Sequence, residues 1–521
     1  MSKAILTISV ILHSGLVVFN PATAAAQQSG ADVARAYRES HEAEIIGDFA
    51  ELLALPNVAS DSAGINRNAI YLRDALRALG IDAELLRLAD KPRVPPIVFG
   101  EIRVPGATRT LGVYVHYDGQ PVDSSRWTHG PWQPTLYTRA MESGGVARSM
   151  PVPGEPVDPE WRIYARSAGD DKAPLGALLP VLTAFREANV TPTSNIKFFF
   201  DGEEEAGSQH LREYLESNRD RVDDIDIWLF FDGPVHQSGR PLLTFGVRGV
   251  TSMEVTVYGP NRPLHSGHYG NWAPVPGQML AELLATMKDG DGNVLVEGFY
   301  DTVEPIGDAE REALAALPDY DEELKEELGL AWTEGEGQSL AERLLLPSLT
   351  VRGLSSGNVG RLARNVIPAT ATATLGIRLV KGNDPQHMRE LVEAHIQRQG
   401  YHIVREDPDH ATRLAYPKIA KIIGGGGYRA SRTAMDVPIV QEVVGAVRAA
   451  AGDDLVLFPA LGGSLPLYLF TEVMGKPALI VPIANHDDNQ HAPDENLRIA
   501  NLWYAIDLYA ALFTMPPGAT P

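Results

Sequence analysis

The chain has 521 residues, of which 44% are hydrophobic and 21% charged, a composition typical of a globular protein with more than one core and not of a disordered chain. Its formal net charge is -22 and it has no long basic run, which excludes nucleic acid as a partner because phosphate binding needs clustered Lys and Arg. The chain has no cysteine, so any metal must be held by His and carboxylate side chains.

Residues 1–26 have the features of a signal peptide. Lys3 gives a positive start, residues 4–19 are mostly apolar, and residues 21–26 form a run of small side chains suited to cleavage before Gln27. The apolar run is interrupted by polar residues and is short for a bilayer span. We therefore expect a secreted protein, in a bacterial periplasm, with no membrane span after removal of the signal.

After this segment, helix-like and strand-like patterns alternate along the chain. Helical spacing occurs at residues 32–55, 177–189 and 500–513. Short apolar runs predict buried strands at residues 110–115, 196–200, 225–231 and 478–482. The alternation predicts an α/β fold in which helices flank a mostly parallel sheet.

The middle of the chain follows a different pattern. Residues 252–258 and 371–379 alternate apolar and polar side chains with period two, which is typical of half-exposed strands. An acidic helical stretch, residues 308–330, lies between them. This pattern predicts a second, α+β domain at residues 247–428, inserted into the first.

Residues 27–246 and 429–521 would then form the α/β domain. The four consecutive glycines at 424–427 lack the Lys-Ser/Thr ending of a phosphate-binding loop, and we interpret them as a hinge between the domains.

Acids and histidines follow the predicted strands. His116 and Asp118 follow the first, residues 203–205 are three glutamates after the second, and Asp232 follows the third. The loop at 486–491 after the last strand contains His486, Asp487, Asp488 and His491. Because ligand groups gather beyond the carboxyl ends of parallel strands, we expect these side chains to share one cleft.

Taken singly, an acid after a strand is more often a turn or helix-cap residue than a ligand. So many carboxylates in one cleft would nevertheless repel one another unless cations lay among them. Histidine with Asp and Glu, and without Cys, suits zinc, manganese or cobalt. The surplus of carboxylates favours a pair of ions about 3.5–4 Å apart.

At these residues the sequence resembles the co-catalytic metallopeptidase family of carnosine dipeptidases, glutamate carboxypeptidase, aminoacylase and succinyl-diaminopimelate desuccinylase, and most of all the carnosine dipeptidase branch. The resemblance covers nearly the whole mature chain. The matching motifs are His116-Tyr117-Asp118, Gly169-Asp170-Asp171-Lys172, Glu204-Glu205-Ala206-Gly207-Ser208, Asp232, and His491-Ala492-Pro493-Asp494-Glu495.

The resemblance implies two divalent metal ions, most of all zinc, with manganese or cobalt as alternatives. One ion would be held by His116, Asp170 and Asp232, and the other by Asp170, Glu205 and His491. Asp118 would orient His116, Glu204 would be the general base, and the peptide bond after Asp170 would be cis. Glu203, His486, Asp487 and Asp488 are then interpreted as bystanders.

The resemblance also assigns substrate-binding residues: Arg378, Asn365, Gly463 and Ser464. His265, in Leu264-His265-Ser266-Gly267, would reach into the active site of a partner subunit and stabilise the oxyanion. Since the inserted domain commonly forms the dimer interface in this family, it is expected to act as a lid and to make the protein a homodimer.

The activity implied is hydrolysis of the peptide or amide bond of a small substrate by a metal-bridging hydroxide. The first candidate is a dipeptide with a free C-terminal carboxylate, which the guanidinium fork of Arg378 suits. Deacylation of N-acyl amino acids and carboxypeptidase activity remain open. A catalytically silent metal-binding scaffold is a further alternative, against which the presence of Glu204 speaks.

The sequence departs from the family pattern in two places. Ala173 stands where a Gly is usual, which could shift the loop of Asp170. Residues 141–160 are rich in Gly and Pro and are expected to form an extra loop that shapes the cleft.

Overall fold

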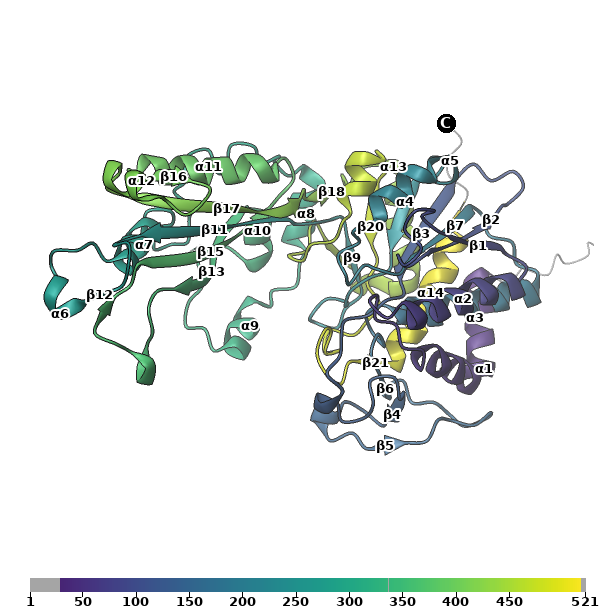
Figure 1. Ribbon diagram of the computed structural model, residues 1–521. Coiled ribbons are helices and arrows are strands. Elements are labelled where there is room, and N and C mark those ends of the chain that lie inside the picture. Colours follow the sequence, from purple (N-terminus) through teal and green to yellow (C-terminus); the bar gives the residue numbers. More distant parts are fainter. Residues whose placement is uncertain (1–28, 336, 517–521) are drawn as a thin grey trace, which may run out of the picture.

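A computed structural model describes residues 29–335 and 337–516, and an eight-stranded sheet forms the larger part of it (Figure 1). Four neighbouring strands at its centre run parallel: β7 (Asn195–Asp201), β3 (Thr110–His116), β8 (Ile227–Phe230) and β20 (Ala478–Ile480). The outer strands, which include antiparallel pairings, are β1 (Asp82–Leu86), β2 (Ile97–Ile102), β9 (Leu242–Thr244) and β19 (Val456–Phe458). The predicted α/β fold with a mostly parallel sheet is confirmed.

Helices cover both faces of this sheet because its central strands are apolar along their length. Every residue of β3 is buried, and successive side chains point to opposite faces. Val113 and Phe200 belong to one core, which is covered by α1 (Gly30–Leu53), α2 (Ser62–Ala78), α3 (Lys172–Ala188), α13 (Pro438–Ala451) and α14 (Ile499–Phe513). Tyr114 and Phe199 belong to the opposite core, with α4 (Leu211–Ser217) and α5 (Arg219–Val222).

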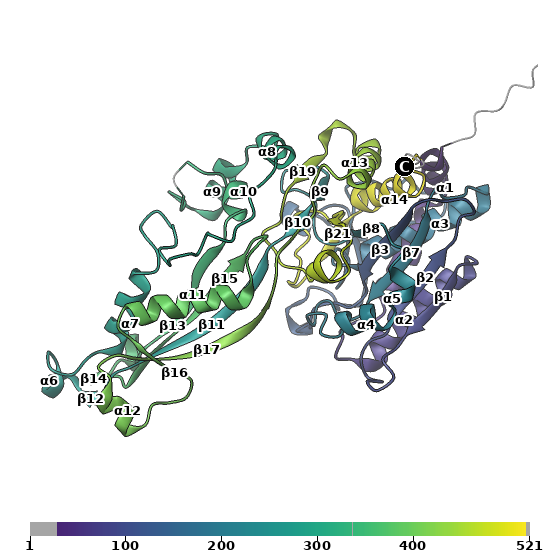
Figure 2. The same ribbon diagram turned by 90° about the horizontal axis from the view of Figure 1, so that it is seen from above.

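A five-stranded sheet forms the second part of the molecule, which we call the lid (Figure 2). Its strand order is β13 (Ser348–Ser355), β15 (Thr370–Leu379), β11 (Gly249–Tyr258), β17 (Ile419–Tyr428) and β16 (His402–Val404). Helices α7 (Pro276–Ala285) and α11 (Pro385–Arg398) pack on one face of it. Along β11 and β15 most of the alternate side chains are buried against these helices, as the period-two pattern predicted.

The helix predicted at 177–189 is present but begins earlier, at Lys172, since Pro174 in its first turn occupies a position where no backbone N–H is needed. Two other local expectations were wrong. The acidic stretch 308–330 is not one helix but two, α8 (Asp308–Ala315) and α9 (Asp321–Leu328), separated around Pro318. The glycine run interpreted as a hinge loop instead lies within β17.

Close approach of β11 explains two of the glycines of β17. The pairing of these strands shifts register between Thr251 and Met253, as at a β-bulge. A Cβ atom on Gly427 would lie 2.3 Å from the carbonyl oxygen of Val250, so a side chain there would force the two strands apart. A Cβ atom on Gly425 would lie 2.2 Å from the hydroxyl oxygen of Ser252, and the Ser252 side chain would have to move.

Residues 141–160, predicted to be an extra loop, contribute in part to a small four-stranded sheet. Its order is β21 (Asn496–Arg498), β6 (Arg162–Tyr164), β4 (Thr135–Tyr137) and β5 (Ala147–Arg148). The guanidinium carbon of Arg148 lies 3.4 Å from the ring centroid of Trp161, which fixes the segment against the sheet.

Within residues 29–335 and 337–516, no helix has both the length and the apolar character needed to cross a membrane.

Candidate metal centre

The predicted acids and histidines meet at one edge of the eight-stranded sheet. β3 ends at His116, β7 ends just before the three glutamates at 203–205, and Asp232 follows β8. The loop after β20 carries His491. Since β7, β3, β8 and β20 are parallel, their carboxyl ends and the following loops lie on the same side. The structure therefore brings together residues that are far apart in the sequence.

One group of candidate ligands consists of His116, Asp170 and Asp232, and all three are buried. His116 Nε2 lies 2.8 Å from Asp170 Oδ1 and 4.0 Å from Asp232 Oδ2. Each of the three residues offers a donor atom within 4.8 Å of the others. This spacing is suitable for a single cation between them.

A second group consists of Asp170, Glu205 and His491. His491 Nε2 lies 2.9 Å from Asp170 Oδ2 and 3.3 Å from Glu205 Oε2. Asp170 thus directs one carboxylate oxygen to each group. A carboxylate placed in this way can bridge two neighbouring metal ions.

The electrostatics of the cluster favour cations. Burial raises the pKa of Asp232 to about 7, and the carboxylates of Asp170 and Glu205 add to this rise. Hydrogen bonds to Asp170 and Glu205 raise the pKa of His491 to about 10. Among the described residues, Asp232 Oδ2 is buried without any hydrogen-bond partner. A divalent ion would satisfy this oxygen and offset the repulsion between the carboxylates.

Asp118 holds the backbone that carries the two glutamates. Its carboxylate accepts hydrogen bonds from the backbone N–H groups of Glu204 and Glu205, each at 3.0 Å. Asp118 Oδ1 also lies 3.4 Å from His116 Nδ1. Asp118 is fully buried and therefore acts on the positions of its neighbours rather than on a bound substrate.

Glu204 lies half-buried beside both groups, and its carboxylate makes no hydrogen bond with any residue that the structure describes. Burial raises the pKa of its carboxyl group well above the usual range, and the charges of Asp232 and Asp118 act in the same direction. Glu203, interpreted as a bystander, accepts a hydrogen bond of 2.6 Å from the backbone N–H of His210. The side chains of these adjacent acids therefore differ: the Glu203 carboxylate stabilises its own loop, and the Glu204 carboxylate does not.

Three of the predicted substrate-binding residues lie together. Arg378 Nη1 donates a hydrogen bond of 2.6 Å to the hydroxyl of Ser464, and Gly463 accepts one of 3.1 Å from the backbone N–H of Arg248. Tyr428, which sequence reasoning did not select, donates its hydroxyl proton to the backbone oxygen of Ser464 at 3.0 Å. Burial raises the pKa of Tyr428, and the negative charge of Glu204 adds to this rise.

His265 and Asn365 lie elsewhere. His265 ends β12 (Leu264–His265), which pairs with β14 (Val366–Ile367), and the backbone oxygen of Asn365 accepts a hydrogen bond from Ser266 N at 3.0 Å. Both views place β12 and the short helix α6 (Ser266–Tyr269) at the end of the lid remote from β3 and β8 (Figures 1 and 2). A single chain therefore does not bring His265 or Asn365 to Glu204.

Two glutamines next to the cluster were missed. Gln120 Nε2 donates to Glu205 Oε2 at 2.7 Å, and Gln490 Nε2 donates to Asp170 Oδ2 at 2.6 Å. The only signal in the sequence is their closeness to Asp118 and His491.

The loop of Asp170 has the expected cis peptide bond, between Asp170 and Asp171. Ala173, which stands where a Gly is usual, is buried in the first turn of α3.

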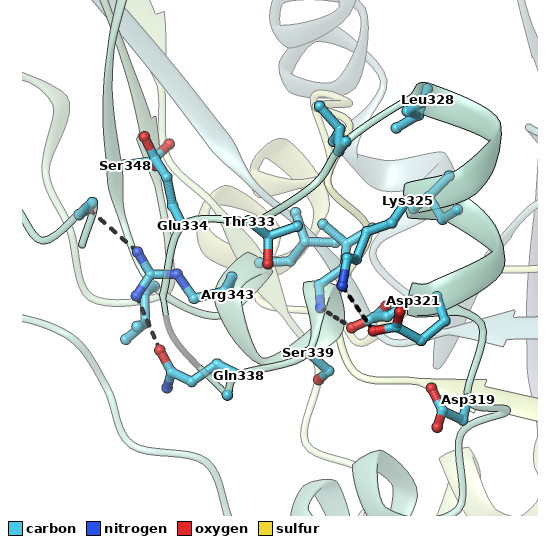
Figure 3. Close-up of a pocket in the computed structure, with 18 of the residues that line it drawn as sticks. Asp319, Asp321, Lys325, Leu328, Thr333, Glu334, Gln338, Ser339, Arg343 and Ser348 are labelled. Atoms are coloured by element: carbon cyan, nitrogen blue, oxygen red, sulfur yellow. Dashed lines mark hydrogen bonds and ion pairs between the residues drawn. The ribbon is translucent and has the colours of Figure 1, made fainter. Parts of the chain in front are cut away.

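A large cavity of about 700 Å³ lies in the lid, away from these residues (Figure 3). Its wall includes α9 and α10 (Leu340–Leu344). Its charged lining residues include the pairs Lys288–Glu334 at 2.6 Å and Lys325–Glu322 at 2.8 Å. Because its lining contains none of the candidate metal ligands, we place the functional site at the carboxylate cluster instead.

The model of a known family, described as Peptidase family M20/M25/M40, matches residues 112–515. The chain is 28% identical over 492 residues to the Cys-Gly metallodipeptidase DUG1 of Candida albicans, covering 89% of this chain and 92% of that protein. It is 25% identical over 503 residues to the human Beta-Ala-His dipeptidase, covering 92% of this chain and 91% of the relative.

Among solved structures, the chain is similar to the M20 family metallo-carboxypeptidase Sso-CP2 from Sulfolobus solfataricus. The TM-score is 0.71 and the sequence identity is 28%, with 91% of this chain and 99% of the other covered. The chain therefore shares its whole two-part fold with Sso-CP2.

Replacing the shared carboxylate should affect metal binding more than replacing a residue of one group. We expect Asp170→Asn to weaken binding of every metal equivalent, and Asp232→Asn to weaken only part of it, because Asp170 belongs to both groups. Titration against a chromogenic chelator measures this. Asp487→Asn is the control, since Asp487 in the same region pairs with Arg162 and belongs to neither group. Equal losses in the two ligand variants would contradict a shared Asp170.

Proposed function

Because the chain belongs to peptidase family M20/M25/M40, we propose that it is a metal-dependent dipeptidase, which hydrolyses the peptide bond of a small substrate with a free C-terminal carboxylate. The proposal rests on the carboxylate of Asp170, which is shared by the two groups of candidate metal ligands. Glu204 lies beside these groups, and its own carboxylate is not used in a hydrogen bond to the described part of the chain. A shared carboxylate next to a free one is the arrangement that hydrolysis at paired metals needs.

The names of the relatives favour a dipeptide. The Candida albicans and human relatives are named as dipeptidases, and the Sulfolobus solfataricus structure as that of a metallo-carboxypeptidase. Both kinds of activity act on substrates that have a free terminal carboxylate. The exposed guanidinium of Arg378, held against Ser464, is suited to bind such a group.

We further infer that the centre binds two divalent ions, with zinc as the first candidate and manganese or cobalt as alternatives. The nitrogen and oxygen donors fit all three metals. One ion would take His116, Asp170 and Asp232, and the other Asp170, Glu205 and His491. When bound, such ions polarise the scissile carbonyl group and lower the pKa of the attacking water.

The residues of the chain would move the proton and hold the substrate. Glu204 would accept the proton of the attacking water and later deliver it to the leaving amine, which its raised pKa favours. Asp118 keeps Glu204 in place through the backbone. Arg378 and Ser464 would exchange their mutual hydrogen bond for bonds to the substrate carboxylate.

The substrate class is tested with a panel of dipeptides, N-acyl amino acids and longer peptides, using purified protein loaded with metal. We expect turnover of dipeptides, its loss in chelator, and its return with zinc. Glu204→Gln should lower kcat about 10²–10⁴-fold, because it removes the general base, while the metal content stays unchanged. Glu203→Gln is the matched control, since Glu203 contacts His210 rather than the cluster.

Each other outcome identifies a different function. Turnover of N-acyl amino acids alone would make the protein a deacylase on the same site, and turnover of longer peptides alone a carboxypeptidase. Metal-loaded protein that cleaves nothing in the panel would contradict the dipeptidase proposal and favour a silent metal-binding scaffold.

We also propose that residues 247–428 act as a lid and form the interface of a homodimer. The remote end of the lid exposes large apolar side chains from the sequence between β12 and β14: Trp272 at 80%, Leu354 at 61%, Val359 at 86% and Leu362 at 64% exposure. Apolar surface of this kind marks an interaction site. In a twofold dimer through this surface, His265 of each chain could complete the active site of its partner.

Mixing two inactive variants tests this exchange of His265. We expect His265→Ala to lower kcat about 10²–10³-fold by removing a donor to the oxyanion. Refolded together, His265→Ala and Glu204→Gln chains should recover about a quarter of the native activity, because half of the dimers are mixed and each has one complete site. Glu204→Gln mixed with Asp170→Asn should recover none, because each chain then has a defect in its own cluster that its partner does not supply. No recovery in the first mixture would contradict the exchange.

For localisation, we propose export to a bacterial periplasm, directed by residues 1–26. These residues lie outside the described part of the chain, and the support is their sequence: a positive start, an apolar run and small residues before Gln27. Protein isolated from an exporting host should begin at Gln27 on N-terminal sequencing. A retained Met1 would exclude cleavage.

A further inference from the structure

The loop that carries Asp170 has little regular structure to hold it. It connects β6 to α3, and Ser167, Asp170 and Asp171 within it are buried. Buried backbone N–H groups need partners, and those of this loop are not supplied by a neighbouring strand. The position of the Asp170 carboxylate therefore depends on what binds the loop's backbone.

The carboxylate of Glu495 supplies those partners. Its Oε1 accepts hydrogen bonds from the backbone N–H groups of Gly169 at 3.0 Å and Asp170 at 2.8 Å. Its Oε2 accepts one from the N–H of Ser167 at 2.9 Å and one from Arg166 Nη1 at 2.6 Å. Glu495 is completely buried, so water does not compete for these bonds.

The same residue also connects this loop to the loop of His491. The backbone oxygen of Glu495 accepts a hydrogen bond from the N–H of Ala165 at 3.0 Å. Arg166, the charged partner of Glu495, donates through Nη2 to the backbone oxygen of Ala492 at 3.3 Å. The contacts around Glu495 thus fix two loops whose side chains, Asp170 and His491, lie 2.9 Å apart in the cluster.

We infer that Glu495 is a positioning residue for the metal centre, which sets the Asp170 carboxylate between its two groups of ligands. The inference rests on the metal centre proposed above. It requires a carboxylate, because both oxygens receive two donors each and only an ionised carboxylate accepts at every position. A glutamine would turn an amide N–H₂ toward backbone donors and leave Arg166 without a charged partner.

The test is metal affinity in Glu495→Gln, measured by competition titration. Replacing a residue that orients a metal ligand typically lowers the metal affinity about 10–100-fold, and we expect a loss of about that size here. We also expect a changed absorption spectrum of the Co²⁺-loaded protein, which reports the geometry of the ligands. In turnover, kcat should fall with little change in KM, because Glu495 does not touch the substrate.

Glu442→Gln is the matched control. The carboxylate of Glu442 accepts a hydrogen bond from Nη1 of the buried Arg109, as that of Glu495 does from Arg166, but Arg109 directly precedes Thr110, at the end of β3 opposite His116. We expect this variant to keep the native metal affinity and Co²⁺ spectrum. A loss in the control equal to that in Glu495→Gln would show a general effect of removing the charged partner of a buried arginine and overturn the inference.

The remaining outcomes separate this inference from the proposed function. Native affinity and spectrum in Glu495→Gln, even with a lower melting temperature, would make Glu495 merely structural and overturn the inference alone. Wild-type protein that binds no metal would overturn the proposed centre itself. If Glu495→Gln does not fold, Glu495→Asp decides, because it keeps the charge but is too short for all four donors. Its affinity should fall at least about tenfold, and an unchanged affinity would overturn the inference.

Discussion

Asp170 places one carboxylate oxygen 2.8 Å from His116 and the other 2.9 Å from His491, and the surrounding structure keeps it there. The cost of this arrangement is a set of like charges with almost no water around them. The fold meets that cost with rigid supports, since Asp118 braces the glutamate loop and Glu495 braces the aspartate loop. Both supports accept hydrogen bonds from backbone N–H groups and take no bond from the carboxylate oxygens of the candidate ligands, which leaves those oxygens facing the cluster.

The two large sheets position different groups of side chains. Parallel strands buried on both faces can bring loops from four places in the sequence to one edge, as here after β3, β7, β8 and β20. The lid sheet is antiparallel except at one edge and has helices on one face, which leaves polar side chains such as Arg378 on the other face, where Arg378 bonds Ser464 of the large domain. The large sheet thus gathers the candidate metal ligands, and the lid sheet supplies a guanidinium group that is not used up in its own core.

Much of this could be predicted from the sequence. The strands appeared as apolar runs, and most candidate ligands as His and acids in the loops after them, because both patterns are local. Asp170 follows no predicted strand and was reached through the family resemblance. Tyr428, Gln120 and Gln490 were missed because nothing near them in the sequence indicates which distant atoms they contact. The glycine run was misread for a similar reason, since the need for Gly425 and Gly427 arises from the approach of β11. The positions of His265 and Asn365 at the far end of the lid likewise depend on pairing that a single sequence does not reveal.

The last fifty residues or so of the chain have a consequence for the order in which the molecule forms. They contribute β20, His491, Glu495, β21 and α14, whose apolar residues belong to the main core with those of α1 and α3. Contacts of such large sequence separation form late, because the closure of long loops must precede them. A nascent chain still lacking this segment has the three residues of the first group, but it lacks His491 of the second group, Glu495 behind Asp170, and the helix that packs with α1. The complete pair of ligand groups therefore arises as one of the final events of folding, and a chain shortened at this end would be without it.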